Sequence, residues 1–246
     1  MLSAIIVAAG SSRRTGFDKL FAEIAGAPVI AHTIRAFERA PSVNEIIVVA
    51  REDRHGEIKK IVRKETFKKV RPIIRGGEYR QDSVRAGLGS VNPDAKYVAV
   101  HDAARPLITP EQIERVFEQC RAHRGAASAE PINDTLKRAD VEPFASGSHH
   151  GGLAGQVLVV TGSVDRHQLY AMQTPQIFER ALIEEAYRAV YAKNISVTDE
   201  VSAAEWLGCD VVVVLNDDFN FKITYPRDLP LAEFVLKQRM QSASKA

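Results

Sequence analysis

Small residues and cations lie close together directly after the first apolar run of the chain. Ala8–Gly10 end that run, and Arg13, Arg14 and Lys19 come soon afterwards. A turn of small residues lets backbone N–H groups approach an anion closely, and the three cations add attraction, so the segment suits a triphosphate. It matches neither GxGxxG nor GxxxxGKS/T, which disfavours a hydride-transfer enzyme and a P-loop protein. A plain strand-to-helix turn with solvated arginines is the alternative.

Two further polar segments follow predicted strands. The glycine turn 75–83 leads into a helix and holds Ser83 near the helix start, where a base or ribose could lie. His101, Asp102 and Arg105 stand at the tip of a central strand, where buried charges are costly unless a ligand or metal compensates them. Asp102 suits Mg²⁺ or a sugar hydroxyl. A metal-dependent phosphohydrolase would need further His and Asp residues that the sequence does not show.

Short apolar runs rich in β-branched residues alternate with helical stretches along the chain. Such runs are typical of strands buried on both faces, so we predict an α/β fold with a mostly parallel twisted sheet and helices on both faces. The polar segments then gather at the carboxyl ends of the strands, where open α/β folds bind ligands. The predicted strands are Ile5–Ala8, Ile46–Ala50, Val70–Ile74, Tyr97–Val100, Ala126–Pro131 and Val211–Leu215.

Capping residues predict where several helices begin and end. Thr109 precedes Pro110, and Gln112 stands where a capping box requires it, so a helix should run from there to about His123. Three elements are predicted nearer the C-terminus: a helix over 199–207 that Gly208 ends, a polar strand over 220–224 that carries Lys222, and a helix over 229–240 that Pro226 opens.

Residues 137–170 interrupt the alternation and predict an excursion from an otherwise single domain over residues 1–246. The segment is rich in glycine, contains His149 and His150, and includes the apolar strand Val157–Val160. A two-stranded arm is marginally stable alone in water, so we expect this one to pack on a second subunit and form a homodimer. A hairpin folded back on its own domain is the alternative. The adjacent histidines indicate a surface loop rather than a metal site.

Composition excludes several classes of protein. With 33 Lys and Arg against 31 Asp and Glu, a formal net charge of +2 and 45% hydrophobic residues, the chain is typical of a soluble globular protein. The near balance of charge argues against a nucleic-acid partner. No apolar run reaches the ~20 residues of a membrane span, and no basic segment marks a signal peptide. Two cysteines without a CxxC motif indicate a reducing compartment, so we expect a cytoplasmic protein.

Eight motifs occur in order along almost the whole chain: AAGSSRR with a downstream Lys, GGEYRQDSVRAGL, VHDAARP, PINDTLKR, VDR, QTPQ, SVTDE and NFKIT-x-P-x-D-L. Together they resemble the 2-C-methyl-D-erythritol 4-phosphate cytidylyltransferase family of the non-mevalonate isoprenoid pathway. The resemblance implies a Rossmann-like nucleotidyltransferase fold and a homodimer formed through a protruding β-arm. It also implies a reaction of CTP with methylerythritol phosphate that gives the CDP-alcohol and pyrophosphate with Mg²⁺ or another divalent cation.

The same resemblance implies roles for individual residues. The four expected catalytic residues are Arg14 and Lys19, which match transition-state stabilisers, and Arg166 and Lys222, which match residues that position the acceptor phosphate. The positions that match CTP-binding residues are Ala8, Ala9, Gly10, Ser12, Gly77, Glu78, Ser83 and Asp102. The positions that match acceptor-binding residues are Arg105, Thr135, Arg166, Thr174, Thr198 and Lys222. Asp102 is the candidate metal ligand, with most Mg²⁺ ligands expected from the CTP phosphates.

The expected chemistry is in-line attack of an acceptor phosphate on the α-phosphorus of CTP, with no covalent intermediate. An already ionised acceptor needs no general base, so the enzyme has mainly to neutralise and align two anions. A cytidylyltransferase acting on ribitol 5-phosphate or a related sugar-alcohol phosphate is the rival interpretation. A non-catalytic nucleotide-binding regulator is more distant, because a pure binder gains nothing from cations placed for a transition state.

Overall fold

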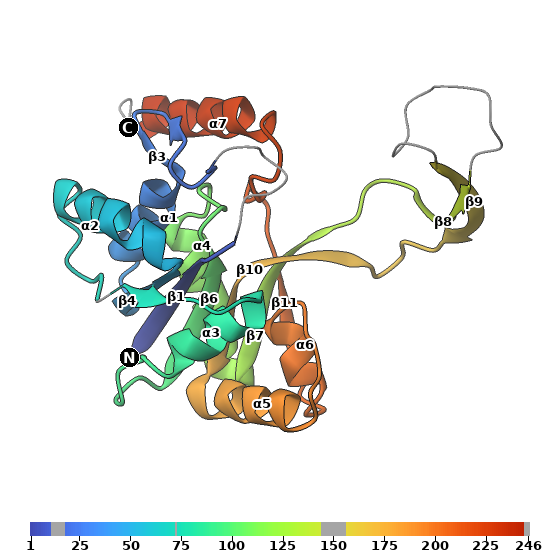
Figure 1. The fold of residues 1–246 in the computed structure, drawn as a ribbon, viewed down its shortest axis with the longest axis horizontal. Helices are drawn as coiled ribbons and strands as arrows, with labels where there is room; N and C mark the ends of the chain where they lie inside the picture. The colour runs from blue at the N-terminus through green and yellow to red at the C-terminus, as the bar shows by residue number, and fades with distance from the viewer. Residues whose placement is uncertain (11–17, 72, 144–155, 244–246) are drawn as a thin grey trace. The chain divides into compact units, whose positions relative to one another are not determined.

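The computed structural model describes residues 1–10, 18–71, 73–143 and 156–243 (Figure 1). It divides into two compact units. The first comprises Met1–Ala129 together with Met172–Ala246, and the second comprises Glu130–Ala171.

A seven-stranded sheet forms the centre of the first unit, in the order β11-β7-β10-β6-β1-β4-β5. β1 pairs in parallel with both β4 and β6, while β4 pairs in parallel with β5 and β7 with β11. The mostly parallel sheet predicted from the sequence is therefore confirmed. The bounds are β1 (Leu2–Ala8), β4 (Val43–Ala50), β5 (Ile74–Arg75), β6 (Tyr97–Asp102), β7 (Gly125–Pro131), β10 (Tyr170–Glu179) and β11 (Val212–Leu215).

Helices cover both faces of this sheet, because side chains that alternate along each strand point to opposite faces. Ile6 of β1 belongs to a core cluster with α1, α2 and α4, whereas Ile5 belongs to a cluster with α3, α5 and α6. Helix α7 packs in a third cluster with Ile24 and Leu107. The bounds are α1 (Val29–Arg39), α2 (His55–Lys64), α3 (Arg80–Leu88), α4 (Pro110–His123), α5 (Arg180–Ala192), α6 (Glu200–Glu205) and α7 (Asp228–Ala243).

The capping box predicted at the start of one helix is confirmed, and a second helix begins after a capping residue that was not predicted. The Thr109 side chain accepts from the Gln112 N–H, the Gln112 side chain accepts in return, and α4 ends at His123. Asp199 caps α6 by accepting from the Ser202 N–H at 2.9 Å. Gly208 follows with φ of 68°, a left-handed conformation that favours glycine. Helix α6 itself is shorter than the predicted 199–207.

Two predicted elements are corrected, and a third is confirmed with a different start. Residues 220–224 are not a strand, because loop contacts hold them instead: the Ile223 N–H donates to the Ala104 carbonyl at 2.8 Å. The predicted helix over 229–240 lies within α7, which begins at Asp228 and not at Pro226, and the Asp228 carboxylate accepts from the N–H of Thr224 at 2.7 Å. The predicted strand 70–74 is reduced to β5 and a single parallel bridge from Val70 to Ile46.

The second unit is a two-stranded antiparallel sheet. β8 (Leu136–Pro143) pairs with β9 (Gln156–Val164). Apolar side chains of β9 are exposed, among them Leu158 at 66% and Val160 at 60%. This strand pair overlaps the segment 137–170 that was predicted as an excursion, and the unit that contains it spans Glu130–Ala171. Its role as a dimerisation arm stays a prediction. His149 and His150 lie outside the described residues.

Among the described residues, no helix is both long enough and apolar enough to cross a bilayer.

Two glycines near the end of α3 allow a direct test of core packing. A Cβ added at Gly87 would lie 2.6 Å from Cγ2 of the buried Ile5, whereas one added at Gly89 would meet nothing nearer than 3.6 Å. We expect Gly87→Ala to lower the free energy of unfolding by about 1–3 kcal/mol, as overpacking does. Gly89→Ala should leave it unchanged or raise it by about 0.4–1 kcal/mol. Urea unfolding of the two variants measures their free energies of unfolding. Equal values would contradict the close contact between Gly87 and Ile5.

Candidate active site

A cavity of about 910 Å³ opens at the carboxyl ends of β1 and β6, beside the turn that leads into α3. Small residues from the end of β1 form one part of its wall, and the glycine turn forms another. The predicted site residues that it brings together are Ala8, Ala9, Gly10, Lys19, Gly77, Glu78, Ser83, Asp102 and Lys222.

Two predicted site residues, Ser12 and Arg14, lie outside the described residues. Thr135 and Arg166 lie in the second unit, where the Arg166 guanidinium donates to the Asn133 carbonyl. Their predicted roles stay predictions.

Three more predicted residues lie in the first unit but do not line the cavity. Thr174 is buried, and its hydroxyl accepts from the Asp102 N–H at 3.1 Å. Arg105 donates to the Asn220 carbonyl at 2.7 Å. Thr198 is 3.4 Å from the Ser202 hydroxyl. Thr174 and Arg105 therefore support the residue that reaches the cavity, Asp102.

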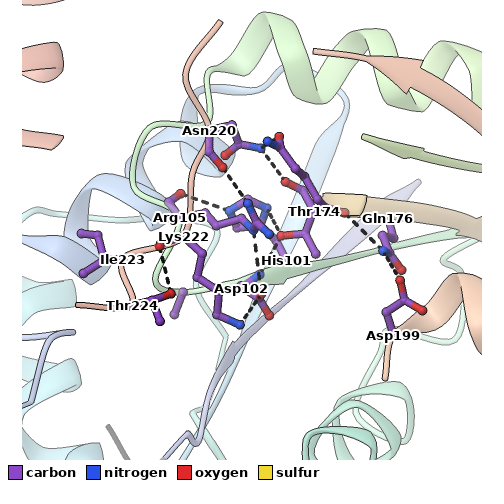
Figure 2. A network of polar contacts seen from close by, with 12 residues as sticks. His101, Asp102, Arg105, Thr174, Gln176, Asp199, Asn220, Lys222, Ile223 and Thr224 are labelled. Carbon is purple, nitrogen blue, oxygen red and sulfur yellow. Dashed lines mark hydrogen bonds and ion pairs between the residues drawn. The ribbon is translucent and has the colours of Figure 1, made fainter. Parts of the chain in front are cut away.

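Two lysines face the cavity from different segments. Lys19 Nζ donates to the Ile223 carbonyl at 2.5 Å, which links the end of the first loop to segment 220–224. Lys222 Nζ lies 2.7 Å from Asp102 Oδ2 (Figure 2), and its side chain is 37% exposed. The irregular segment 220–224 thus contains Lys222 and, through the Ile223 carbonyl, also binds Lys19.

Within the part of the chain that the structure describes, three cations converge on the Asp102 carboxylate. Besides Lys222, Arg80 Nε lies 3.2 Å from Oδ1 and Arg105 Nε lies 3.9 Å from Oδ2. Burial by itself would raise the pKa of Asp102, but the charges of Arg80, Lys222 and Arg105 outweigh it and hold that pKa well below its usual range. Asp102 is therefore ionised and compensated by the protein itself.

Arg80 belongs to an ion pair that the sequence did not reveal. Its two Nη atoms contact both carboxylate oxygens of Glu200 at 2.7 and 3.0 Å, and Glu200 is completely buried. The Tyr187 hydroxyl donates to Glu200 Oε1 at 3.0 Å. In the sequence Glu200 follows a capping Asp and resembles any acidic residue of a first helical turn, so no pattern indicated that its charge is buried.

Arg54 is a second residue that sequence reasoning missed. It is 5% exposed, and its Nη1 donates to the carbonyls of Ala8 at 2.7 Å and Gly10 at 2.8 Å. Its Nε lies 2.6 Å from Asp18 Oδ2, next to Lys19. One buried guanidinium therefore joins the end of β1 to the residue before Lys19.

His101 connects this network to the core. It is fully buried, its Nε2 faces the Arg105 carbonyl at 3.2 Å, and its Nδ1 lies 3.1 Å from the Thr174 hydroxyl (Figure 2). Nε2 therefore carries the proton, and Nδ1 accepts from Thr174. Burial lowers the pKa of His101 to about 3, although the hydrogen bond to the Arg105 carbonyl opposes the shift.

The described residues offer a poor protein-held metal site. They contain no cluster of three or more His, Cys, Asp or Glu side chains that could hold an ion. Asp102 is the candidate ligand, but both of its oxygens already contact cations. The predicted role of Asp102 as a metal ligand therefore fits this geometry poorly.

The depressed pKa of His101 predicts a loss of stability in mild acid. Below the ordinary pKa of about 6.5, the unfolded chain binds a proton that the folded chain rejects until about pH 3. We expect His101 to lower the free energy of unfolding by up to about 1.4 kcal/mol per pH unit between pH 6 and 5. Asp102 adds nothing in that window, because it is ionised in both states.

Denaturant unfolding of the wild type and of His101→Gln between pH 7 and 5 measures this effect. The Gln variant should show the shallower pH dependence. Some dependence should remain in it, because burial also lowers the pKa of His32. Identical slopes for the two proteins would contradict a neutral His101.

Known proteins resemble this chain over nearly its whole length. The model of the 2-C-methyl-D-erythritol 4-phosphate cytidylyltransferase family matches residues 2–238. A protein of that name from Halalkalibacterium halodurans is 35% identical over 239 residues, which is 96% of this chain and 97% of the relative. Another from Dehalococcoides mccartyi is 38% identical over 238 residues, 96% of each chain.

Solved structures of proteins with related names are also similar to this chain over nearly its whole length. The crystal structure of 4-diphosphocytidyl-2C-methyl-D-erythritol synthase from Anaerococcus prevotii has a TM-score of 0.79 at 29% identity and covers 96% of this chain and 98% of that chain. The 2-C-methyl-D-erythritol 4-phosphate cytidylyltransferase from Thermus thermophilus has a TM-score of 0.72 at 25% identity, with 95% and 98% covered. Because the family model and these relatives span nearly all of the sequence, this chain belongs to the 2-C-methyl-D-erythritol 4-phosphate cytidylyltransferase family.

Proposed function

We propose that this protein transfers the cytidylyl group of CTP to 2-C-methyl-D-erythritol 4-phosphate and releases pyrophosphate. The products are 4-diphosphocytidyl-2-C-methyl-D-erythritol and pyrophosphate, in non-mevalonate isoprenoid precursor biosynthesis. The observation that carries the proposal is the cavity, which joins nine residues expected from the family resemblance. These residues come from segments far apart in the chain. Their presence in one cavity is therefore support that the order of the motifs along the sequence does not itself provide.

The distribution of charge in the cavity suits the two ends of CTP. Lys19 and Lys222 attract phosphates, and Ala9 and Gly10 lack side chains that would keep an anion from the backbone. Glu78 repels phosphates, so the base and ribose fit the wall made by the glycine turn. A Cβ at Gly76 would lie 2.5 Å from the Ala9 Cβ, and glycine there lets the turn pack against the end of β1.

The reaction needs alignment and charge neutralisation more than proton transfer. An oxygen of the acceptor phosphate forms a bond to the α-phosphorus while the bond from that phosphorus to the bridging oxygen breaks, and pyrophosphate carries away the electron pair. We assign transition-state stabilisation to Arg14 and Lys19 and positioning of the acceptor phosphate to Arg166 and Lys222. Removing one such charged donor typically costs ~3 kcal/mol of transition-state stabilisation.

We assign the divalent cation to the substrate. Mg²⁺ keeps several waters and is commonly held by substrate phosphates with few protein ligands, which fits a site whose carboxylate is already compensated. The nucleotide substrate is then the Mg²⁺ complex of CTP.

A cytoplasmic location is part of the proposal. It rests on the thiols of Cys120 and Cys209, both of which are free.

The substrate assignment is tested by pyrophosphate release over a panel of acceptors with CTP and Mg²⁺. Methylerythritol phosphate should give the highest kcat/KM, and omission of the divalent cation should abolish release. A higher kcat/KM with ribitol 5-phosphate would overturn the assignment in favour of the rival cytidylyltransferase. Binding of CTP without turnover of any acceptor would favour the nucleotide-binding regulator.

We also propose a homodimer in which β8 and β9 pack on a second copy. The support is the exposed apolar surface of β9 together with Val141 of β8, which is 54% exposed. A two-stranded sheet has no core of its own, and a second chain would cover these side chains. If the arms exchange across a two-fold axis, Arg166 of one chain serves the site of the other.

Subunit complementation tests this arrangement. Homodimers of Arg166→Ala and of Lys222→Ala should be nearly inactive. A mixed dimer would have one site with both lesions and one intact site, so up to about half of the normal activity should return. Activity is measured after subunit exchange, with the heterodimer confirmed by native mass spectrometry. Activity that stays at the mutant level would place Arg166 in the site of its own chain.

A further inference from the structure

The three cations around Asp102 differ in how firmly the protein holds them. Exposed fractions of the side chains are 37% for Lys222, 24% for Arg80 and 12% for Arg105. Lys222 lines the cavity and meets Asp102 through a single ammonium contact at 2.7 Å. It is the cation most able to turn from the carboxylate to a substrate phosphate.

Arg80, in contrast, is held on both sides. Its Nε faces Asp102, while its two Nη atoms grip Glu200 in the bidentate geometry that fixes a guanidinium. Glu200 is itself held by the Tyr187 hydroxyl and by its own N–H, which donates to Gln176 Oε1 at 3.0 Å. These contacts keep Arg80 beside Asp102 when a ligand binds in the cavity.

The charges balance in a way that depends on Arg80. Among the described residues, the cluster contains two carboxylates, Asp102 and Glu200, and three cations. When Lys222 moves away from Asp102, the two carboxylates and the two arginines remain, and the charges of these four side chains sum to zero. Without Arg80, departure of Lys222 would leave one uncompensated carboxylate in the interior, which is strongly unfavourable.

We propose that Arg80 is a positioning residue that keeps Asp102 compensated and so lets Lys222 move to the acceptor phosphate, with Glu200 and Tyr187 holding Arg80 in place. This inference rests on the proposed function, because it needs an acceptor phosphate in the cavity. Arg80 also lines the cavity, but its guanidinium nitrogens face Asp102 and Glu200, so it acts on the acceptor through Lys222. Without Arg80, the ion pair between Asp102 and Lys222 becomes stronger. The acceptor phosphate must then compete with the Asp102 carboxylate for Lys222.

A double-mutant cycle on acceptor binding tests the proposal without requiring turnover. Methylerythritol phosphate is titrated calorimetrically into enzyme saturated with Mg²⁺ and α,β-methylene-CTP. Arg80→Met should weaken acceptor binding about 10-fold, equivalent to about 1.4 kcal/mol. In the Asp102→Asn background, where no carboxylate retains Lys222, the same substitution should weaken it less than about 2-fold. Equal effects in the two backgrounds would overturn the proposal.

Two comparisons separate this role from general stabilisation. Arg80→Lys keeps a positive charge beside Asp102 but loses the bidentate pair with Glu200, so it should weaken acceptor binding less than Arg80→Met does; a loss as large as that of Arg80→Met would overturn the proposal. Arg180→Met is the matched control, because Arg180 is 25% exposed and pairs with Glu184 at 2.6 Å outside the cavity. It should leave acceptor affinity unchanged, and a loss equal to that of Arg80→Met would reveal a purely structural effect.

If Arg80→Met does not fold, Asp102→Asn and the double variant still decide the question. A large loss of affinity between those two would overturn the proposal, and near equality would support it. Failure of the wild type to bind or turn over methylerythritol phosphate would instead contradict the proposed function.

Discussion

The ionised carboxylate of Asp102 is the constraint around which the site is organised. Removing a carboxylate from water costs several kcal/mol, so the fold must bring cations and hydrogen-bond donors to the end of β6. Lys222 and Arg80 supply charge from segment 220–224 and from α3, and buried Glu200 balances Arg80 from α6. One buried charge thus ties together elements that the chain order keeps apart.

The part of the cavity wall made by the end of β1 depends on a different interaction. Arg54 does not line the cavity, but it binds the backbone carbonyls of Ala8 and Gly10 and the Asp18 carboxylate, and so holds the end of β1 close to Lys19. Positions of cations in a nucleotidyltransferase matter because catalysis of this kind depends on charge already in place when the reaction begins. Two arginines that contact protein groups, the buried Arg54 and the half-buried Arg80, therefore hold the segments beside the two lysines that face the cavity.

Local rules were sufficient for much of the fold. Apolar β-branched runs predicted the parallel strands, and the capping box at Thr109 and Gln112 predicted the start of α4, because these features depend on neighbouring residues. The clustering of Gly10, Ser83 and Asp102 also followed from the sequence, since parallel strands present their carboxyl ends at one edge of a sheet.

The sequence by itself determined the fold class, the family and which strand ends approach one another. Only the tertiary structure decided that β10 runs antiparallel beside β6, that segment 220–224 is irregular, and that Arg80 pairs with Glu200. The physical reason is the long sequence separation between the residues that interact. Arg80 and Glu200 are 120 positions apart, as are Asp102 and Lys222. Charge compensation acts between atoms that folding brings together, and no periodicity or cap along the chain records it.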